Sequence, residues 1–118
     1  MVRSLGTSSL QSQASSLLRM RDLPTTVLGV MHLELRIPLC NSLKEKRSAL
    51  KPCIHFLRKQ WNLAVAEVGD QDVWRSAILA VATVSNDKNL VENTLREARR
   101  HVSSRNGIEL LDAQIEIL

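Results

Sequence analysis

The sequence predicts an α+β domain in which a four-stranded antiparallel sheet carries two helices on one face. Apolar residues occupy every second position from 27 to 37, which indicates a strand with one buried side. Two later segments repeat apolar residues at helical spacing, and runs rich in Val, Ile, Leu and Ala follow them. The chain has 118 residues, of which 44% are hydrophobic, so we expect one domain with a real core.

The first strand is predicted to end at Pro38 and the first helix to cover residues 43–61. Ser42 and Glu45 have the spacing of a capping box, in which each side chain satisfies a free backbone N–H at the helix start. Apolar residues then form one stripe: Leu43, Leu50, Ile54, Leu57 and Trp61. Pro52 lies inside this helix and predicts a kink near residues 48–52 or a break into two shorter helices.

Residues 62–68 and 77–84 are predicted to form two strands of a hairpin whose connection is wide or bulged. Asn86 or Asp87 is expected to cap a second helix, which a left-handed residue at Asn106-Gly107 would close. The last strand is predicted over residues 108–118, with Leu111, Ala113, Ile115 and Ile117 on one side.

The resulting order β-α-β-β-α-β is that of the split βαβ, or ferredoxin-like, fold. Right-handed crossovers would place both helices on one face of the sheet. The opposite face would carry a set of polar residues from the first and last strands: His32, Glu34, Arg36, Asp112, Gln114 and Glu116. The three aromatic residues of the chain lie outside the first and third strands, so base stacking on the sheet face is not expected.

The first 26 residues differ in composition from the predicted domain, which covers residues 27–118. Residues 1–25 contain six serines and three arginines but a single acid, Asp22. We interpret this segment as a disordered tail or as the result of a translation start assigned too early. An Arg- and Ser-rich leader is also typical of an organellar transit peptide, which leaves that alternative open.

The start of the first helix is unusually basic. Lys44, Lys46 and Arg47 crowd the first turn, although the positive end of the helix dipole favours acidic residues there. At helical spacing, Lys44, Arg47, Lys51, His55 and Arg58 fall within about an 80° arc. Such a row can contact successive phosphates of a nucleic acid; a solvated helix face is the alternative. The candidate phosphate-binding residues are Lys44, Lys46, Arg47, Lys51 and Arg58.

Other candidate sites are weaker. Glu67, Asp70 and Asp72 match no calcium loop and are interpreted as polar hairpin residues, while Trp74 is a candidate for core or dimer packing. Cys40 and Cys53 lack metal-pair spacing and are expected to be free thiols of a reducing compartment. With no recognisable catalytic, cofactor or metal motif, we expect no enzyme and no cofactor. No apolar run approaches the roughly 18 residues of a membrane span.

Several segments occur together in a fixed order: residues 34–38 (Glu-Leu-Arg-Ile-Pro), 42–48 (Ser-Leu-Lys-Glu-Lys-Arg-Ser), 65–68, Gln71-Asp72, Trp74 and 84–87. In this combination residues 27–118 resemble the YlxP-like family of small bacterial proteins of unknown function. The resemblance implies a ferredoxin-like α+β fold. Genes of this family often lie beside those of translation initiation factor two and a ribosome-binding factor, which implies a role in ribosome assembly or translation. It implies no catalytic residues.

Two functions are therefore expected from the sequence. The first is an accessory protein that binds RNA, such as rRNA in the small ribosomal subunit, through the basic first helix. The second is a homodimeric protein-interaction module that does not bind nucleic acid. Either would work in the cytoplasm, or in an organelle if residues 1–25 are a transit peptide.

Overall fold

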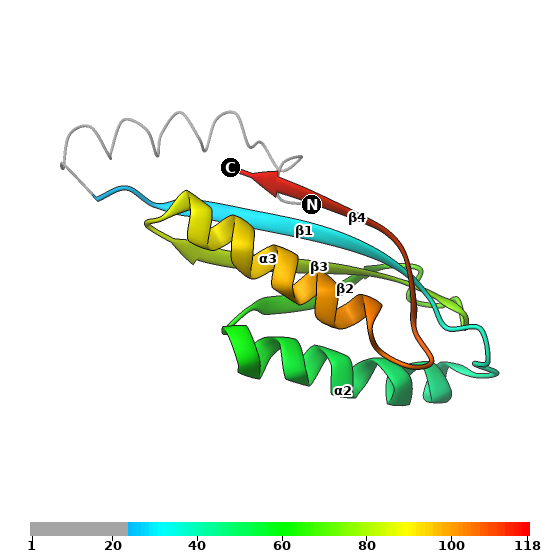
Figure 1. Ribbon diagram of the computed structural model, residues 1–118. Coiled ribbons are helices and arrows are strands. Elements are labelled where there is room, and N and C mark those ends of the chain that lie inside the picture. The colour runs from blue at the N-terminus through cyan, green and yellow to red at the C-terminus, as the bar shows by residue number, and fades with distance from the viewer. Residues whose placement is uncertain (1–23) are drawn as a thin grey trace.

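A computed structural model describes residues 24–118 of the chain, so the predicted tail lies largely outside the described residues. The elements follow the order β1 (Val27–Arg36), α2 (Leu43–Trp61), β2 (Ala64–Gly69), β3 (Ser76–Ser85), α3 (Lys88–Ser103) and β4 (Glu109–Ile117). The four strands form one antiparallel sheet in the order β2-β3-β1-β4. Both helices cover the same face of it (Figure 1). The predicted ferredoxin-like α+β fold is therefore confirmed.

The core lies between the sheet and the helices. Met31, Leu33 and Leu35 of β1 are fully buried there, as are Leu79 and Val81 of β3. Buried residues of α3 cover the centre of the sheet, and those of α2 cover the side near β2: Val91, Leu95, Ala98 and Val102 from α3, and Leu50, Cys53 and Leu57 from α2. The predicted period-two and helical patterns thus mark the buried sides of β1, α2 and α3.

Both helix starts are fixed by side-chain caps. The hydroxyl of Ser42 accepts a hydrogen bond from Glu45 N at 3.0 Å, and the carboxylate of Glu45 accepts one from Asn41 N at 2.9 Å. Asp87 caps α3 by accepting from Asn89 N and Leu90 N. The predicted capping box is present, except that Glu45 reaches the residue before the cap.

Three local predictions need correction. The α-helix α2 continues through Pro52 as one element, so the alternative of a break into two helices is wrong, while the kink near residues 48–52 stays a prediction. Helix α3 ends at Ser103 with Ser104 in a right-handed conformation, and Gly107 (φ 83°) lies in the following turn instead of closing the helix. Leu111 is half exposed because the register shifts between β1 and β4, which places Leu110 opposite Leu35.

The sheet face opposite the helices has two chemically different halves. On β1 and β4 it carries the predicted polar residues, with His32 opposite Gln114 and Glu34 opposite Asp112. On β2 and β3 it carries small apolar residues in register, since Ala64 lies opposite Ala82 and Ala66 opposite Ala80. The predicted polar surface therefore covers only half of this face.

Candidate nucleic-acid interface

Lys46 is not an exposed phosphate-binding residue. Its side chain is only 2% exposed, in line with the buried stripe of α2. The ammonium donates hydrogen bonds to the backbone oxygens of Asp70 at 2.6 Å and Val73 at 2.8 Å. Because its donors point into the protein, Lys46 must be removed from the predicted set of phosphate contacts.

The same ammonium lies 2.7 Å from Oε2 of Glu67, whose carboxylate is largely buried. That oxygen has no hydrogen-bond partner among residues 24–118, so the ion pair with Lys46 is what compensates its charge. A buried carboxylate that lost this opposite charge would keep its full cost of desolvation. Through these contacts Lys46 links the β2–β3 connection to the first turn of α2.

The remaining predicted cations of α2 are exposed. Lys44, Arg47 and Lys51 all lie on the helix surface, and Arg58 is exposed but donates from Nη2 to the carbonyl oxygen of Val65 at 2.7 Å. Val65 belongs to β2, an edge strand of the sheet. Since helical spacing puts the four cations on one flank of α2, this contact locates the flank beside the β2 edge. We call Lys44, Arg47, Lys51 and Arg58 the basic row.

The other flank of α2 faces α3 and is aromatic. Phe56 stacks on His101 of α3, with ring centroids 3.9 Å apart and an angle of 15° between the planes. Trp61 packs edge to face with Phe56 at 5.7 Å and His101 at 6.2 Å. The basic row therefore points away from α3. Sequence reasoning missed this cluster because neither Phe56 nor His101 belongs to the apolar stripe of its helix.

The arginines of α3 do not continue the basic row directly. Arg96, Arg99 and Arg100 share the helix layer with it, but the aromatic cluster lies between α2 and α3. Arg100 also forms an ion pair with Glu97. The helix layer thus has two separate groups of cations instead of one continuous surface.

The surroundings of His101 disfavour its charged form and lower its pKa. Burial lowers the pKa of His101, and the positive charge of Arg105 lowers it further. Arg105 Nη1 lies 3.0 Å from His101 Nε2, and because a guanidinium can only donate, the imidazole nitrogen accepts. The same ring stacks on Phe56.

This depressed pKa predicts a pH dependence of folding. In the unfolded chain His101 binds a proton near pH 6.5, whereas in the folded chain it does so only at lower pH. The contribution of neutral His101 to the free energy of unfolding is therefore fully present above about pH 6.5 and is lost as the pH falls through the lower pKa of the folded chain. His101→Phe keeps an aromatic ring but removes the titration. Urea unfolding at pH 8 and pH 5.5 should show a smaller loss of stability on acidification in this variant than in the wild type. An equal loss in both would assign the pH dependence to other groups.

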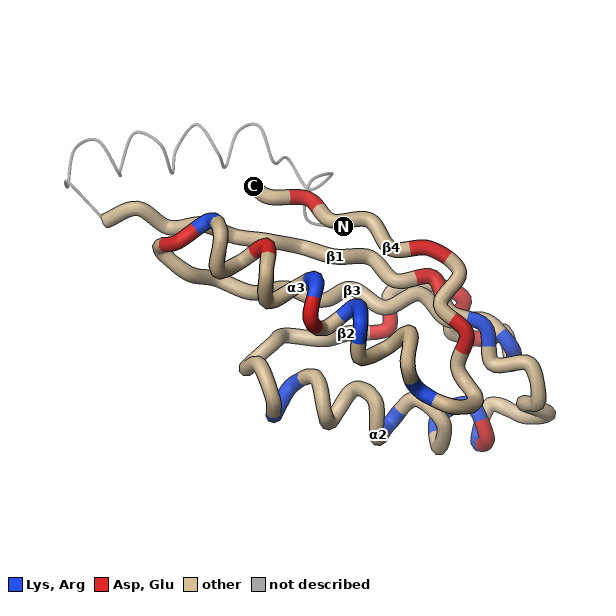
Figure 2. Tube along the Cα trace, viewed as in Figure 1, with Lys and Arg blue, Asp and Glu red and all other residues tan. Residues whose placement is uncertain are grey.

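Helix α2 and the strands differ in charge (Figure 2). Helix α2 contains Lys or Arg at six positions and one acid, Glu45. Among the strands, β1 has one of each sign, β3 has no charged residue, and the rest are acids: Glu67 of β2 and Glu109, Asp112 and Glu116 of β4. The cations are concentrated on α2, whereas β2 and β4 carry acids and no Lys or Arg.

The acidic residues of the β2–β3 hairpin do not converge on one point. Glu67 pairs with Lys46, Asp70 accepts a 2.6 Å hydrogen bond from the hydroxyl of Ser76, and Asp72 is exposed. Within residues 24–118 no group of three or more His, Cys, Asp or Glu side chains could hold a metal ion. Neither described helix has the length and apolar character of a membrane span.

Trp74 is half exposed, so it is not a core residue. Its two neighbours are tied to the start of α2: Val73 through Lys46, and Arg75 through a 2.8 Å hydrogen bond from Nε to the carbonyl oxygen of Cys40. Trp74 is therefore an exposed aromatic side chain on an anchored loop, which fits an interface better than a core.

Cys40 and Cys53 are buried and unpaired, as expected of free thiols.

These features define a two-layer α+β domain with a basic row on its first helix. The family model described as "Protein of unknown function (DUF503)" matches residues 28–115. The chain belongs to this family. It is 30% identical over 83 residues to the uncharacterized protein YlxP of Bacillus subtilis strain 168, a match that covers 70% of this chain and 90% of YlxP.

Solved structures show weaker likenesses. The de novo designed protein Foldit4 is 11% identical, with a TM-score of 0.45 over 79% of this chain and 93% of the design. AtUAH in complex with (S)-hydroxyglycine is 12% identical, with a TM-score of 0.46 over 84% of this chain and 30% of AtUAH. These likenesses add nothing to the assignment of function.

Proposed function

We propose that this domain is a non-enzymatic cytoplasmic accessory protein that binds structured RNA, such as the rRNA of a small ribosomal subunit, along the basic row of α2. The observation that carries the proposal is the placement of Lys44, Arg47, Lys51 and Arg58 on one exposed flank of a single helix. Cations in such a row neutralise successive phosphates and release counterions, which provides most of the affinity of backbone contacts. The acids of β4 lie on the opposite edge strand of the sheet from β2, away from this flank.

The structure of α2 supports a rigid role for this flank. Arg58 is held at Val65 by its hydrogen bond, and the first turn is held by Ser42 and by Lys46. The row from Lys44 to Arg58 spans about 21 Å along the helix. A fixed row of this length suits a phosphate backbone that already has a regular shape, which favours structured RNA over a flexible chain.

The test is co-sedimentation of the full chain with bacterial small ribosomal subunits over a salt series. The variant Lys44→Glu, Arg47→Glu, Lys51→Glu reverses three exposed cations and leaves Arg58, which also stabilises β2. Its matched control, Lys88→Glu, Arg96→Glu, Arg99→Glu on α3, changes the net charge by the same amount. We expect salt-sensitive binding in the wild type and the control, and loss of binding in the α2 variant.

Two results would contradict the proposal. Equal losses in both variants would mean that net charge, and not the basic row, causes the binding. Absence of binding by the wild type at low salt would remove the ribosomal particle as a partner.

A second function is favoured by the apolar half of the open sheet face. Ala66, Ala80 and Ala82 lie there in register, and small side chains allow a second sheet to approach closely. We propose a homodimer through this face as the alternative, with the exposed Trp74 on the loop before β3 as a candidate interface residue. Sedimentation equilibrium should then show a dimer that Ala80→Glu dissociates and that the α2 charge-reversal variant leaves intact. A monomer at high concentration would exclude it.

A further inference from the structure

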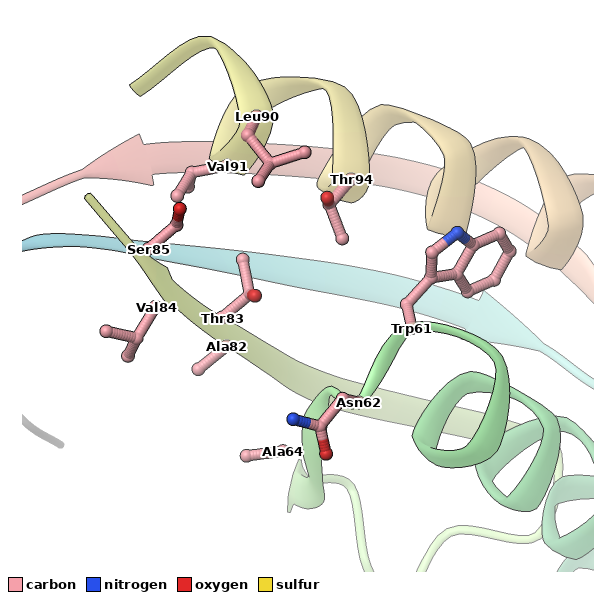
Figure 3. Close-up of a pocket in the computed structure, with 10 residues that line it drawn as sticks. All are labelled: Trp61, Asn62, Ala64, Ala82, Thr83, Val84, Ser85, Leu90, Val91 and Thr94. Carbon is pink, nitrogen blue, oxygen red and sulfur yellow. The ribbon is translucent and has the colours of Figure 1, made fainter. Parts of the chain in front are cut away.

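A hollow of about 430 Å³ opens beyond the C-terminal end of α2 (Figure 3). It forms because β2 begins at Ala64, opposite Ala82, whereas β3 continues to Ser85 without a partner on that side. The first turns of α3 overlie the gap through Leu90 and Thr94. Its size lies in the range of sites for small ligands.

The lining of this hollow contains no ionisable side chain, although 24% of the chain is charged. Trp61 stands at one end, and Leu90 and Val91 supply an apolar wall. The amide of Asn62 and the hydroxyl of Thr94 add uncharged donors and acceptors. An aromatic wall with a few neutral hydrogen-bonding groups suits a flat, polar, uncharged ring, and it disfavours a phosphate or a carboxylate.

The hollow lies at the end of the basic row. Arg58 is bonded to the carbonyl oxygen of Val65, the neighbour of Ala64 in the lining, and Trp61 follows Arg58 by three residues on the same helix. A nucleic-acid strand whose phosphates follow the row therefore reaches the hollow next to Arg58. At that point a phosphate can stay outside with the guanidinium while its base turns inward.

We infer that this hollow receives one unpaired nucleobase of the RNA that binds along α2, with Trp61 as its aromatic wall. The inference rests on the proposed RNA binding and adds to it a requirement for an unstacked base. Stacking on an aromatic side chain tolerates any base, whereas Asn62, Thr83 and Thr94 can form hydrogen bonds with base edges.

The experiment uses the full chain with Trp74→Phe, which leaves Trp61 as the single tryptophan. The probes are a decamer of oligoadenylate and a decamer of the same charge in which every base has been removed. We expect oligoadenylate to quench the fluorescence of Trp61 and to bind about tenfold more tightly than the abasic decamer at equal salt. Trp61→Leu in this background has no tryptophan, so its affinities are measured by the anisotropy of labelled decamers; it should reduce that preference to less than twofold and leave the salt dependence unchanged.

Because Trp61 packs against the core, Trp61→Leu also changes the packing of the domain. Two milder variants therefore test the base site without removing this side chain. Thr94→Val keeps the side-chain shape, and Asn62→Gly keeps the left-handed backbone at φ 53°. Each should lower the preference for oligoadenylate without changing the affinity for the abasic decamer. Equal binding of both decamers with unchanged fluorescence would overturn the base site and leave phosphate binding in place. If neither decamer binds at low salt, the base site is overturned, and co-sedimentation with the small ribosomal subunit decides the RNA proposal separately.

Discussion

Replacing Lys46 with alanine is expected to lower the free energy of unfolding by about 3 kcal/mol or more. The substitution leaves the Glu67 carboxylate without its compensating charge, and it takes a hydrogen-bond donor from the backbone oxygens of Asp70 and Val73. A buried group that loses its partner keeps its full cost of desolvation. Urea unfolding followed by circular dichroism measures the change.

The neighbouring Lys44 provides the matched control, since its side chain is exposed on the same helix turn. Lys44→Ala should change stability by no more than about 0.5 kcal/mol. Removing both members of the buried pair with Lys46→Met and Glu67→Leu should recover part of the loss, because apolar residues of similar volume often replace such pairs well. A loss below about 1 kcal/mol in Lys46→Ala would show that the ammonium is solvated.

Elements whose signals are local could be predicted from the sequence. The alternation of β1, the cap at Ser42 and the cap at Asp87 depend on residues close together in the chain, and the structure has all three. The shift of register that exposes Leu111 depends on how β4 pairs with β1. No pattern within the β4 segment indicates it.

The candidate site was predicted in part for the same reason. The exposed cations of the basic row follow from helical spacing, but the burial of Lys46 depends on where the β2–β3 loop comes to lie. One sequence signal could have found it: Lys46 precedes Leu50 by four residues on the apolar stripe, and Glu67 follows the buried Val65 by two. Two opposite charges on inward-facing positions indicate a buried pair.

Trp61 and the hollow beside it show a different limit. The residue was correctly placed on the apolar stripe of α2, and it packs against the core. The hollow exists because β2 is shorter than β3, which is a property of two elements and not of either sequence segment. Sites formed by unequal strands are therefore found only once the pairing is known.

Gly29→Val is the second substitution with a large expected effect on stability. Gly29 lies on the buried side of β1, where even a Cβ atom would come within 2.4 Å of Val91 Cγ1 and 2.9 Å of Leu95 Cδ1 in α3. Atoms cannot approach so closely, so α3 must move away from the sheet or the side chains must leave their preferred rotamers. We expect a loss of about 3 kcal/mol, measured by urea unfolding.

The physical cause can be separated from the intrinsic preference of valine for strands by a double-mutant cycle. Gly29→Ala should be destabilising alone, and Val91→Ala should be destabilising through the cavity that it leaves. Together they should cost less than the sum of the two, because Val91→Ala removes the atom that the new Cβ would meet. Strict additivity would show that α3 does not approach Gly29 as closely as the structure has it. Close packing at this glycine holds α3 on the centre of the sheet, and with it the apolar wall of the hollow that Leu90 and Val91 supply.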